Sequence, residues 1–270
     1  MKIRDRIKRL LRYFSKTQRY VSGVSLVQFG VASFLLYLTP YGFLLLLIIP
    51  LLNLLLFSRL VSKRSFWFLI VASLRSSIWW LMWCLYAFGL NVIEVMPLWQ
   101  FILLMGAGIA GYVFMVAEDL RSEPHKLLDT ILSLLFVFMS LNVSALLVAL
   151  WHWPVVIVLV LLWFVNYVVS LFWILEYSSS PQVLAGLWSF LVVEMFWVAS
   201  RWLILYSVPH TPILVSQIGL IITALAYCWG GIYVHHKNKT LKRSLVFEYI
   251  VVASVVFVIL MALSRWSVSI

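Results

Sequence analysis

Residues 154–175 read PVVIVLVLLWFVNYVVSLFWIL, and none of these 22 residues is charged. An α-helix rises about 1.5 Å per residue, so about 20 such residues cross the roughly 30 Å hydrocarbon core of a bilayer. The whole chain has the same character, with 64% hydrophobic and 11% charged residues. Soluble domains are about 45 to 50% apolar and about 25% charged. The sequence therefore predicts an integral membrane protein, because it has too few polar residues to cover a water-soluble surface.

Similar apolar stretches lie on both sides of this one, separated by proline-containing turns or by charged residues. Such punctuation is typical of short loops between helices. The sequence predicts an all-α, polytopic membrane bundle of about nine transmembrane helices, forming a single domain over residues 20–270. The nine predicted spans are residues 20–38, 41–57, 66–90, 98–117, 127–150, 154–175, 183–206, 212–234 and 246–264.

The basic residues indicate how these spans are oriented. With nine spans and a cytoplasmic N-terminus, 17 of the 20 Lys and Arg residues fall in cytoplasmic segments. The loops predicted on the outer side carry none, which agrees with the excess of Lys and Arg in cytoplasmic loops of membrane proteins. We therefore expect the C-terminus on the outside. Residues 41–57 are the weakest span, because Pro50 and Asn53 interrupt a short segment that could instead be re-entrant.

Residues 1–19 combine a basic composition with apolar residues at helical spacing. Ile3, Ile7 and Phe14 belong to the apolar stripe, and Lys and Arg fill the other face. This pattern predicts a short amphipathic interfacial helix that binds the anionic cytoplasmic leaflet. A solvated basic tail would explain the charges but not the spacing. The net charge of +11 therefore indicates lipid, not nucleic acid. The residues expected to bind the lipid surface are Lys2, Arg4, Arg6, Lys8, Arg9 and Arg12.

A glycine motif in the fourth predicted span resembles a dinucleotide fingerprint only in its letters. Gly106, Gly108 and Gly111 spell GxGxxG, but that fingerprint requires a preceding strand and a soluble βαβ unit. Small residues at this spacing instead favour close helix packing. We predict that the pairs Gly106/Ala110 and Ala107/Gly111 contact a neighbouring helix.

Tryptophans and cysteines also lie inside the predicted spans. Trp79, Trp80 and Trp83 could line a ligand site, but aromatic stripes in membrane helices more often serve packing. Cys84 and Cys228 are predicted nearer opposite faces of the bilayer, so we expect no disulfide between them. Buried cysteine usually acts as a small apolar packing residue.

Ionisable residues inside the spans are the best candidates for function. Arg75 and Glu194 are predicted near the bilayer midplane, where a charge costs at least about 2.5 to 3.5 kcal/mol on insertion scales. Their equal depth and opposite charge allow an intramembrane ion pair, with Arg201 two turns beyond Glu194. Asn142 and Asn166, like Asn53, fall at comparable depth. A polar cluster at this depth is typical of a substrate or ion pathway, while the structural alternative is a buried pair that fixes helix register.

No pattern predicts catalysis, a metal or a cofactor. Acidic residues and histidines gather near the cytoplasmic helix ends, but neither an HExxH motif nor paired CxxC motifs occur. No GxSxG motif is present either. An intramembrane enzyme is therefore the third hypothesis. The residues at these helix ends are Glu118, Asp119, Glu123, His125, Asp129, Glu176, His235, His236 and Glu248.

Two functional hypotheses precede it. The first is a transport or permease-type protein whose pathway passes Arg75, Glu194, Arg201, Asn142 and Asn166. The second is a non-catalytic membrane scaffold or subunit, which suits minimal loops and a wide apolar surface. The expected location is the cell (inner) membrane, and other membrane proteins are the expected partners.

Overall fold

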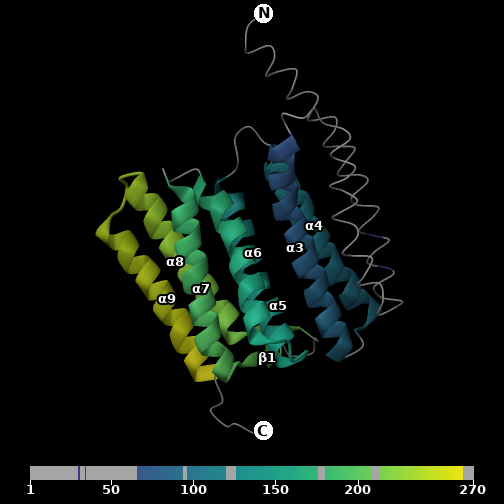
Figure 1. Ribbon diagram of the computed structural model, residues 1–270. Coiled ribbons are helices and arrows are strands. Elements are labelled where there is room, and N and C mark those ends of the chain that lie inside the picture. The colour runs from purple at the N-terminus through teal and green to yellow at the C-terminus, as the bar shows by residue number, and fades with distance from the viewer. Residues whose placement is uncertain are drawn as a thin grey trace, which may run out of the picture. The chain divides into compact units, whose positions relative to one another are not determined.

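The computed structural model describes residues 30, 34, 66–93, 96–119, 126–175, 180–207 and 213–263. Of these described residues, 86% are helical (Figure 1). The predicted interfacial helix 1–19 and the span 41–57 lie outside the described residues. In the first predicted span only Gly30 and Phe34 are described, and both are helical.

Three of the described helices are long and apolar enough to cross a membrane. Shorter apolar stretches fall in three further helices. These lengths support the predicted class of membrane protein, because each long segment covers a bilayer at 1.5 Å per residue. The number of spans and their orientation stay predictions. The three long segments are Thr130–Ala149, Pro181–Trp202 and Gln217–Lys237.

The chain divides into two compact units, one containing residues up to Phe88 together with Val95–Asp129, the other containing Gly89–Glu94 and Thr130–Ile270. Helix α3 (Phe66–Ile93), which belongs to the first unit as far as Phe88, leads to helix α4 (Leu98–Asp119) of the same unit. Pro97 precedes α4, and its carbonyl accepts hydrogen bonds from the backbone N–H groups of Gln100 and Phe101. This start is typical for proline, which has no N–H of its own to satisfy.

Two tryptophans of α3 pack directly on glycines of α4. The rings of Trp79 and Trp83 stack with centroids 5.3 Å apart. Trp79 Nε1 donates to the Gly108 carbonyl at 3.0 Å, and Trp83 Nε1 donates to the Leu104 carbonyl at 2.7 Å. A Cβ added at Gly108 would collide with the Trp83 ring. The missing side chain of glycine therefore makes room for an indole ring.

This contact confirms the packing interpretation of the glycine motif and corrects its details. A Cβ added at Gly111 would collide with the Trp79 ring, whereas one at Gly106 would meet nothing within 4 Å. Gly106, Ala107 and Ala110 are exposed. The prediction that Gly106/Ala110 forms the contact was wrong, because the rings of Trp79 and Trp83 pack against Gly111 and Gly108 instead.

In the second unit, helices α5 (Lys126–Ala149), α6 (Val155–Leu175) and α7 (Pro181–Ala199) follow one another with short connections. Helices α6 and α7 lie side by side (Figure 1). The buried side of α7 recurs at a spacing of four, three and four residues, which is one face of a helix. Its buried residues are Ala185, Ser189, Val192 and Phe196.

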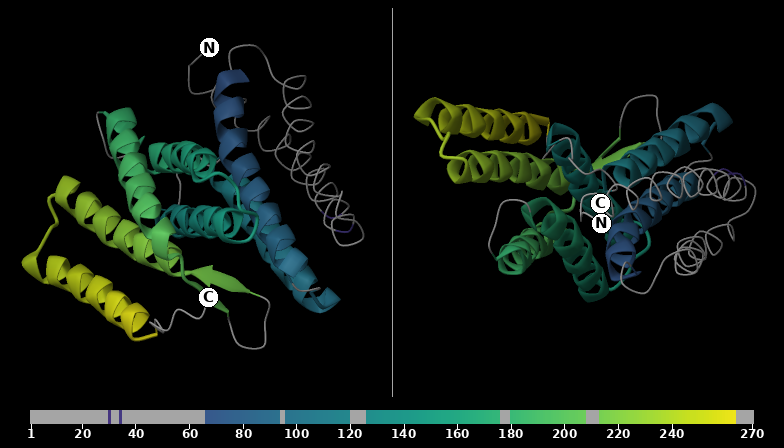
Figure 2. Two further views of the ribbon diagram at one scale, coloured as in Figure 1. Left: turned by 60° about the horizontal axis from the view of Figure 1, so that its bottom comes forward. Right: turned by 90° about the horizontal axis from the view of Figure 1, so that it is seen from above.

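A small β-hairpin interrupts the helices after α7, and the sequence did not predict it. Helix α7 ends at Ala199, a 3-10 turn (η1, Ser200–Trp202) follows, and strand β1 (Leu205–Ser207) pairs antiparallel with β2 (Leu214–Ser216), as Figure 2 shows. The predicted spans 183–206 and 212–234 were therefore wrong at these ends. Proline at 209 and 212 of the sequence has no N–H to donate in a helix, and the pairing of β1 with β2 satisfies the backbone groups of the strands.

Helices α8 (Gln217–Lys237) and α9 (Arg243–Leu263) form a hairpin of two adjacent helices (Figure 1). Ser216 caps α8, because its hydroxyl accepts a hydrogen bond from the Gly219 N–H at 3.1 Å. Between the helices, Cys228 Sγ donates to the Tyr249 carbonyl at 3.2 Å. Both cysteines, Cys84 and Cys228, are free thiols.

Candidate functional site

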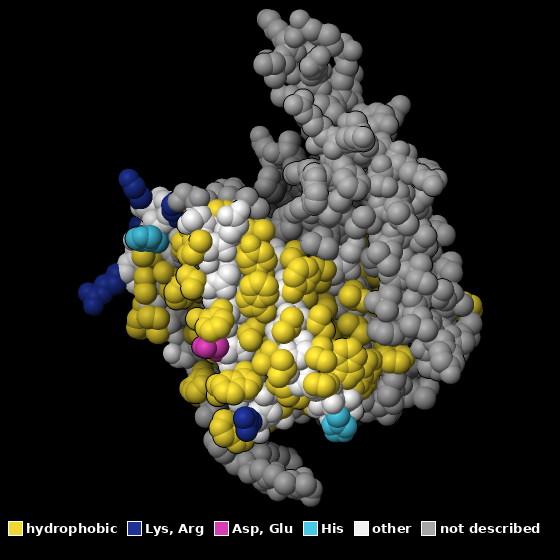
Figure 3. All heavy atoms as spheres, in the orientation of Figure 1, with side chains coloured by type: hydrophobic (Ala, Val, Ile, Leu, Met, Phe, Trp, Pro, Cys, Tyr) yellow, Lys and Arg dark blue, Asp and Glu magenta, His cyan; other side chains and the backbone are white. Residues whose placement is uncertain are grey.

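Glu194 lies on the outer side of helix α7. The buried face of α7 contains Ser189, Val192 and Phe196, while Glu194 belongs to the exposed face. Its neighbours on that face are large and apolar, with Phe190 56% exposed and Trp197 50% exposed. On the face that Figure 3 shows, the described surface is largely hydrophobic, and an acidic side chain lies among the hydrophobic ones. The carboxylate of Glu194 therefore lies among apolar side chains of the kind that normally contact lipid.

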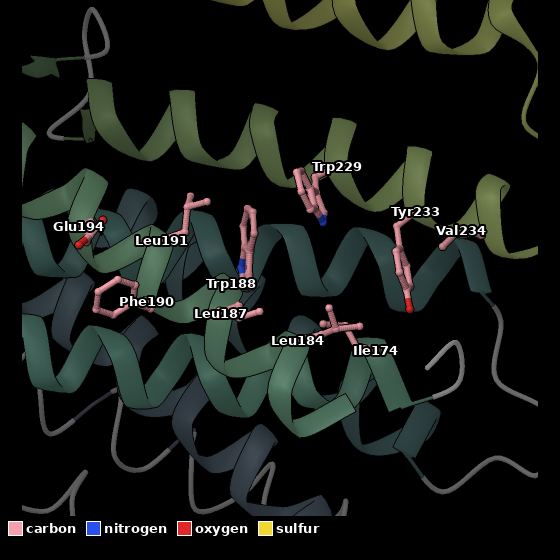
Figure 4. A pocket seen from close by; sticks show the side chains of 10 residues that line it. All are labelled: Ile174, Leu184, Leu187, Trp188, Phe190, Leu191, Glu194, Trp229, Tyr233 and Val234. Atoms are coloured by element: carbon pink, nitrogen blue, oxygen red, sulfur yellow. The ribbon is translucent and has the colours of Figure 1, made fainter. Parts of the chain in front are cut away.

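Glu194 also stands at one end of a groove between α7 and α8. The groove has a volume of about 360 Å³, which falls in the usual range of about 300 to 1,000 Å³ for binding pockets. Trp188 of α7 and Trp229 of α8 extend into the space between the two helices, and Tyr233 lies at the far end from Glu194 (Figure 4). Apart from the carboxylate, the indole N–H groups and the phenol hydroxyl, the walls are apolar. The other lining residues are Ile174, Leu184, Leu187, Phe190, Leu191 and Val234.

The predicted ion pair between Arg75 and Glu194 stays a prediction. Arg75 belongs to helix α3 of the first unit, and its side chain lies outside the described part. Arg201 is exposed in η1. It follows Glu194 by seven residues, or about 10 Å along the axis at helical rise. Within 126–175, 180–207 and 213–263, no described Lys, Arg or His forms an ion pair with Glu194.

Asn142 is fully buried in α5, and its side chain holds the β1–β2 hairpin in place. The side-chain carbonyl accepts a hydrogen bond from the Ser216 backbone N–H at 2.6 Å. Its amide nitrogen donates to the Phe138 carbonyl at 2.7 Å. A Cβ at Gly219 would stand 3.1 Å from that nitrogen, so glycine there admits the amide. Both ends of this side chain are used for structure.

Asn166 of α6 is equally buried and also contacts α5. Its Nδ2 donates to Ser140 Oγ at 3.3 Å and to the Leu162 carbonyl at 3.0 Å. Asn166 Oδ1 is buried and has no hydrogen-bond partner among the described atoms. The seryl hydroxyls nearby donate to carbonyls of their own helices, as Ser144 does to Ser140 and Ser170 to Asn166. Hydroxyls bonded in this way need no water, which suits a helix in lipid.

Within the second unit, the structure places the predicted asparagines apart from Glu194 and Arg201. Asn142 and Asn166 lie inside the second unit, Glu194 and Arg201 lie on the exposed side of α7 and η1, and only the backbone of Arg75 is described. The predicted lipid-binding residues of 1–19 lie outside the described residues. No group of three or more His, Cys, Asp or Glu side chains is placed to hold a metal ion among the described residues.

Two features of the site were not predicted from the sequence. The first is the exposure of Glu194, because α7 is apolar on all sides and its composition does not show which side is buried. The second is the groove, whose walls come from residues far apart in sequence, such as Trp188 and Trp229, which are 41 positions apart. No protein-family model matches the chain, and neither the curated proteins nor the solved structures contain a match to it.

Proposed function

We propose that the protein is a non-catalytic membrane subunit that binds another integral membrane protein along the exposed face of α7 and the adjoining groove. The observation that carries this proposal is the carboxylate of Glu194 among the large, exposed apolar side chains of α7, such as Phe190 and Trp197. Charged side chains within a membrane segment are rare and normally face another protein group. A binding partner supplies such a group, whereas lipid chains do not.

The buried polar residues support a subunit more than a transporter. A transport pathway needs polar groups that converge on a space accessible to the solute. Both ends of the Asn142 side chain are bonded within the fold, and Asn166 is bonded to Ser140 and Leu162. Glu194 lies outside this interior. These contacts explain the asparagines as structural groups that join helices.

The topology belongs to the same proposal. It has nine spans, as the apolar stretches of the sequence indicate, with a cytoplasmic N-terminus and an outer C-terminus, as the distribution of basic residues indicates. A location in the cell (inner) membrane fits the narrow loops and the absence of any long hydrophilic segment in the sequence.

Site-specific photo-cross-linking in native membranes tests the proposed function. A benzophenone amino acid replaces Phe190 on α7, and the matched control carries it at Val160 on α6, which is 62% exposed. We expect a cross-linked protein of one discrete mass from position 190, much less of it from position 160, and a reduced yield when Glu194→Gln is added. The substitution weakens the product because it removes the charge on this face.

Equal product from both positions would contradict a binding face on α7. So would a purified protein that by itself carries a solute across liposomes and loses this activity with Glu194→Gln. That second outcome would restore the transport hypothesis.

A further inference from the structure

The depth of Glu194 determines what can neutralise it. The apolar segment Pro181–Trp202 has 22 residues, and Glu194 is the fourteenth. At helical rise it lies about 19 Å from one end of that segment and about 12 Å from the other. A glutamate side chain is much shorter than either distance, so on the proposed topology, in which this segment crosses the hydrocarbon core, the carboxylate lies away from the lipid headgroups. A charged carboxylate at such a depth is normally paired with a protein group of opposite charge.

The exposed side of α7 has the spacing of a helix-packing seam. Exposed positions recur at intervals of four, three, four, three and four residues. This alternation is the a/d pattern along which a second helix packs at a crossing angle near 20°. On α7 the seam consists of Val183, Leu187, Phe190, Glu194 and Trp197, and Arg201 continues the spacing in η1.

A second copy of this chain does not suit the seam. Two copies in one membrane share their orientation, so a two-fold axis along the membrane normal brings identical residues of two parallel helices together. Glu194 would then face Glu194 at the same depth. Like charges at such close range are unfavourable, so charge complementarity points to a different helix.

We propose that the partner helix on this face carries a lysine or arginine opposite Glu194. The inference rests on the proposed function, because it specifies the chemistry of the partner. The basic side chain pairs with the carboxylate, while the apolar residues of the partner pack along Leu187, Phe190 and Trp197. The tryptophans of the groove offer further apolar contact beside the pair.

Synthetic transmembrane peptides test this inference directly. The full-length protein with benzophenone at position 190 is reconstituted in phosphatidylcholine vesicles with a leucine-rich peptide of about 23 residues. The peptide carries a central lysine, leucine or glutamate. We expect the lysine peptide to be captured about 3- to 20-fold more than the leucine peptide, the range that interhelical polar contacts in membranes give. This preference should disappear with Glu194→Gln and persist with Arg75→Gln.

The remaining outcomes distinguish the two proposals. Suppose that position 190 captures the lysine and leucine peptides equally, and captures each of them more than position 160 does. The binding face then stands, and the basic partner is refuted. If capture at position 190 does not exceed capture at position 160, both proposals are contradicted. If the lysine preference arises only after Arg75→Gln, Glu194 is already paired within the chain and the inference is refuted.

Discussion

Gly108→Ala is expected to lower the free energy of unfolding by about 1 to 3 kcal/mol, the usual effect of overpacking a tight contact. The added methyl group would collide with the Trp83 ring, whose N–H also donates to the Leu104 carbonyl. Moving the ring therefore breaks a hydrogen bond as well as a packing contact. The measurement is unfolding in mixed detergent micelles with increasing dodecyl sulfate, followed by circular dichroism.

Gly106→Ala is the matched control in the same motif. It lies half a turn away on the same helix, and nothing stands within 4 Å of the added methyl group. Replacing glycine by alanine inside a helix normally stabilises it by about 0.5 to 1 kcal/mol. The two substitutions should thus shift stability in opposite directions. Equal stabilisation by both would show that α3 and α4 do not pack as described.

Asn142→Leu should destabilise the second unit. It removes the acceptor of the Ser216 N–H, which remains buried beside the start of α8. An unsatisfied buried N–H costs about 1 to 3 kcal/mol. We expect a loss of this size in the same unfolding assay, and faster proteolysis in the 203–213 region because the hairpin loses its attachment to α5.

Asn166→Leu provides the comparison for that variant. Asn166 Oδ1 has no described partner, and Ser140 Oγ keeps its own bond to the Val137 carbonyl at 2.8 Å. No backbone donor is left unsatisfied, so the substitution should cost less than about 1 kcal/mol. A loss as large as that of Asn142→Leu would contradict the assignment of different roles to the two asparagines.

Helix positions were predictable from the sequence where prolines or charges mark the ends. The span predicted at residues 154–175 is helix α6, Val155–Leu175, and the segment predicted at 98–117 is helix α4, Leu98–Asp119. In both cases a proline precedes the first helical turn, where its missing N–H does no harm. These signals are local, so a single sequence is enough to find them.

Other features depend on contacts between distant segments and were not predictable. Strands β1 and β2 have three residues each, too few for an alternating pattern to be recognised. The pairing of Trp83 with Leu104 and Gly108 depends on how α3 and α4 face each other. The exposure of Glu194 is hidden for the same reason, because an apolar helix shows no difference between its lipid face and its protein face.

The most direct test is a structure of the protein extracted from its own membrane in lipid nanodiscs, so that any protein or lipid bound along α7 is retained. The proposal predicts a second protein's helix along the seam, with a lysine or arginine nitrogen within about 4 Å of the Glu194 carboxylate, the range of an ion pair. Lipid alone along α7, together with an Arg75 guanidinium bound to Glu194, would contradict it.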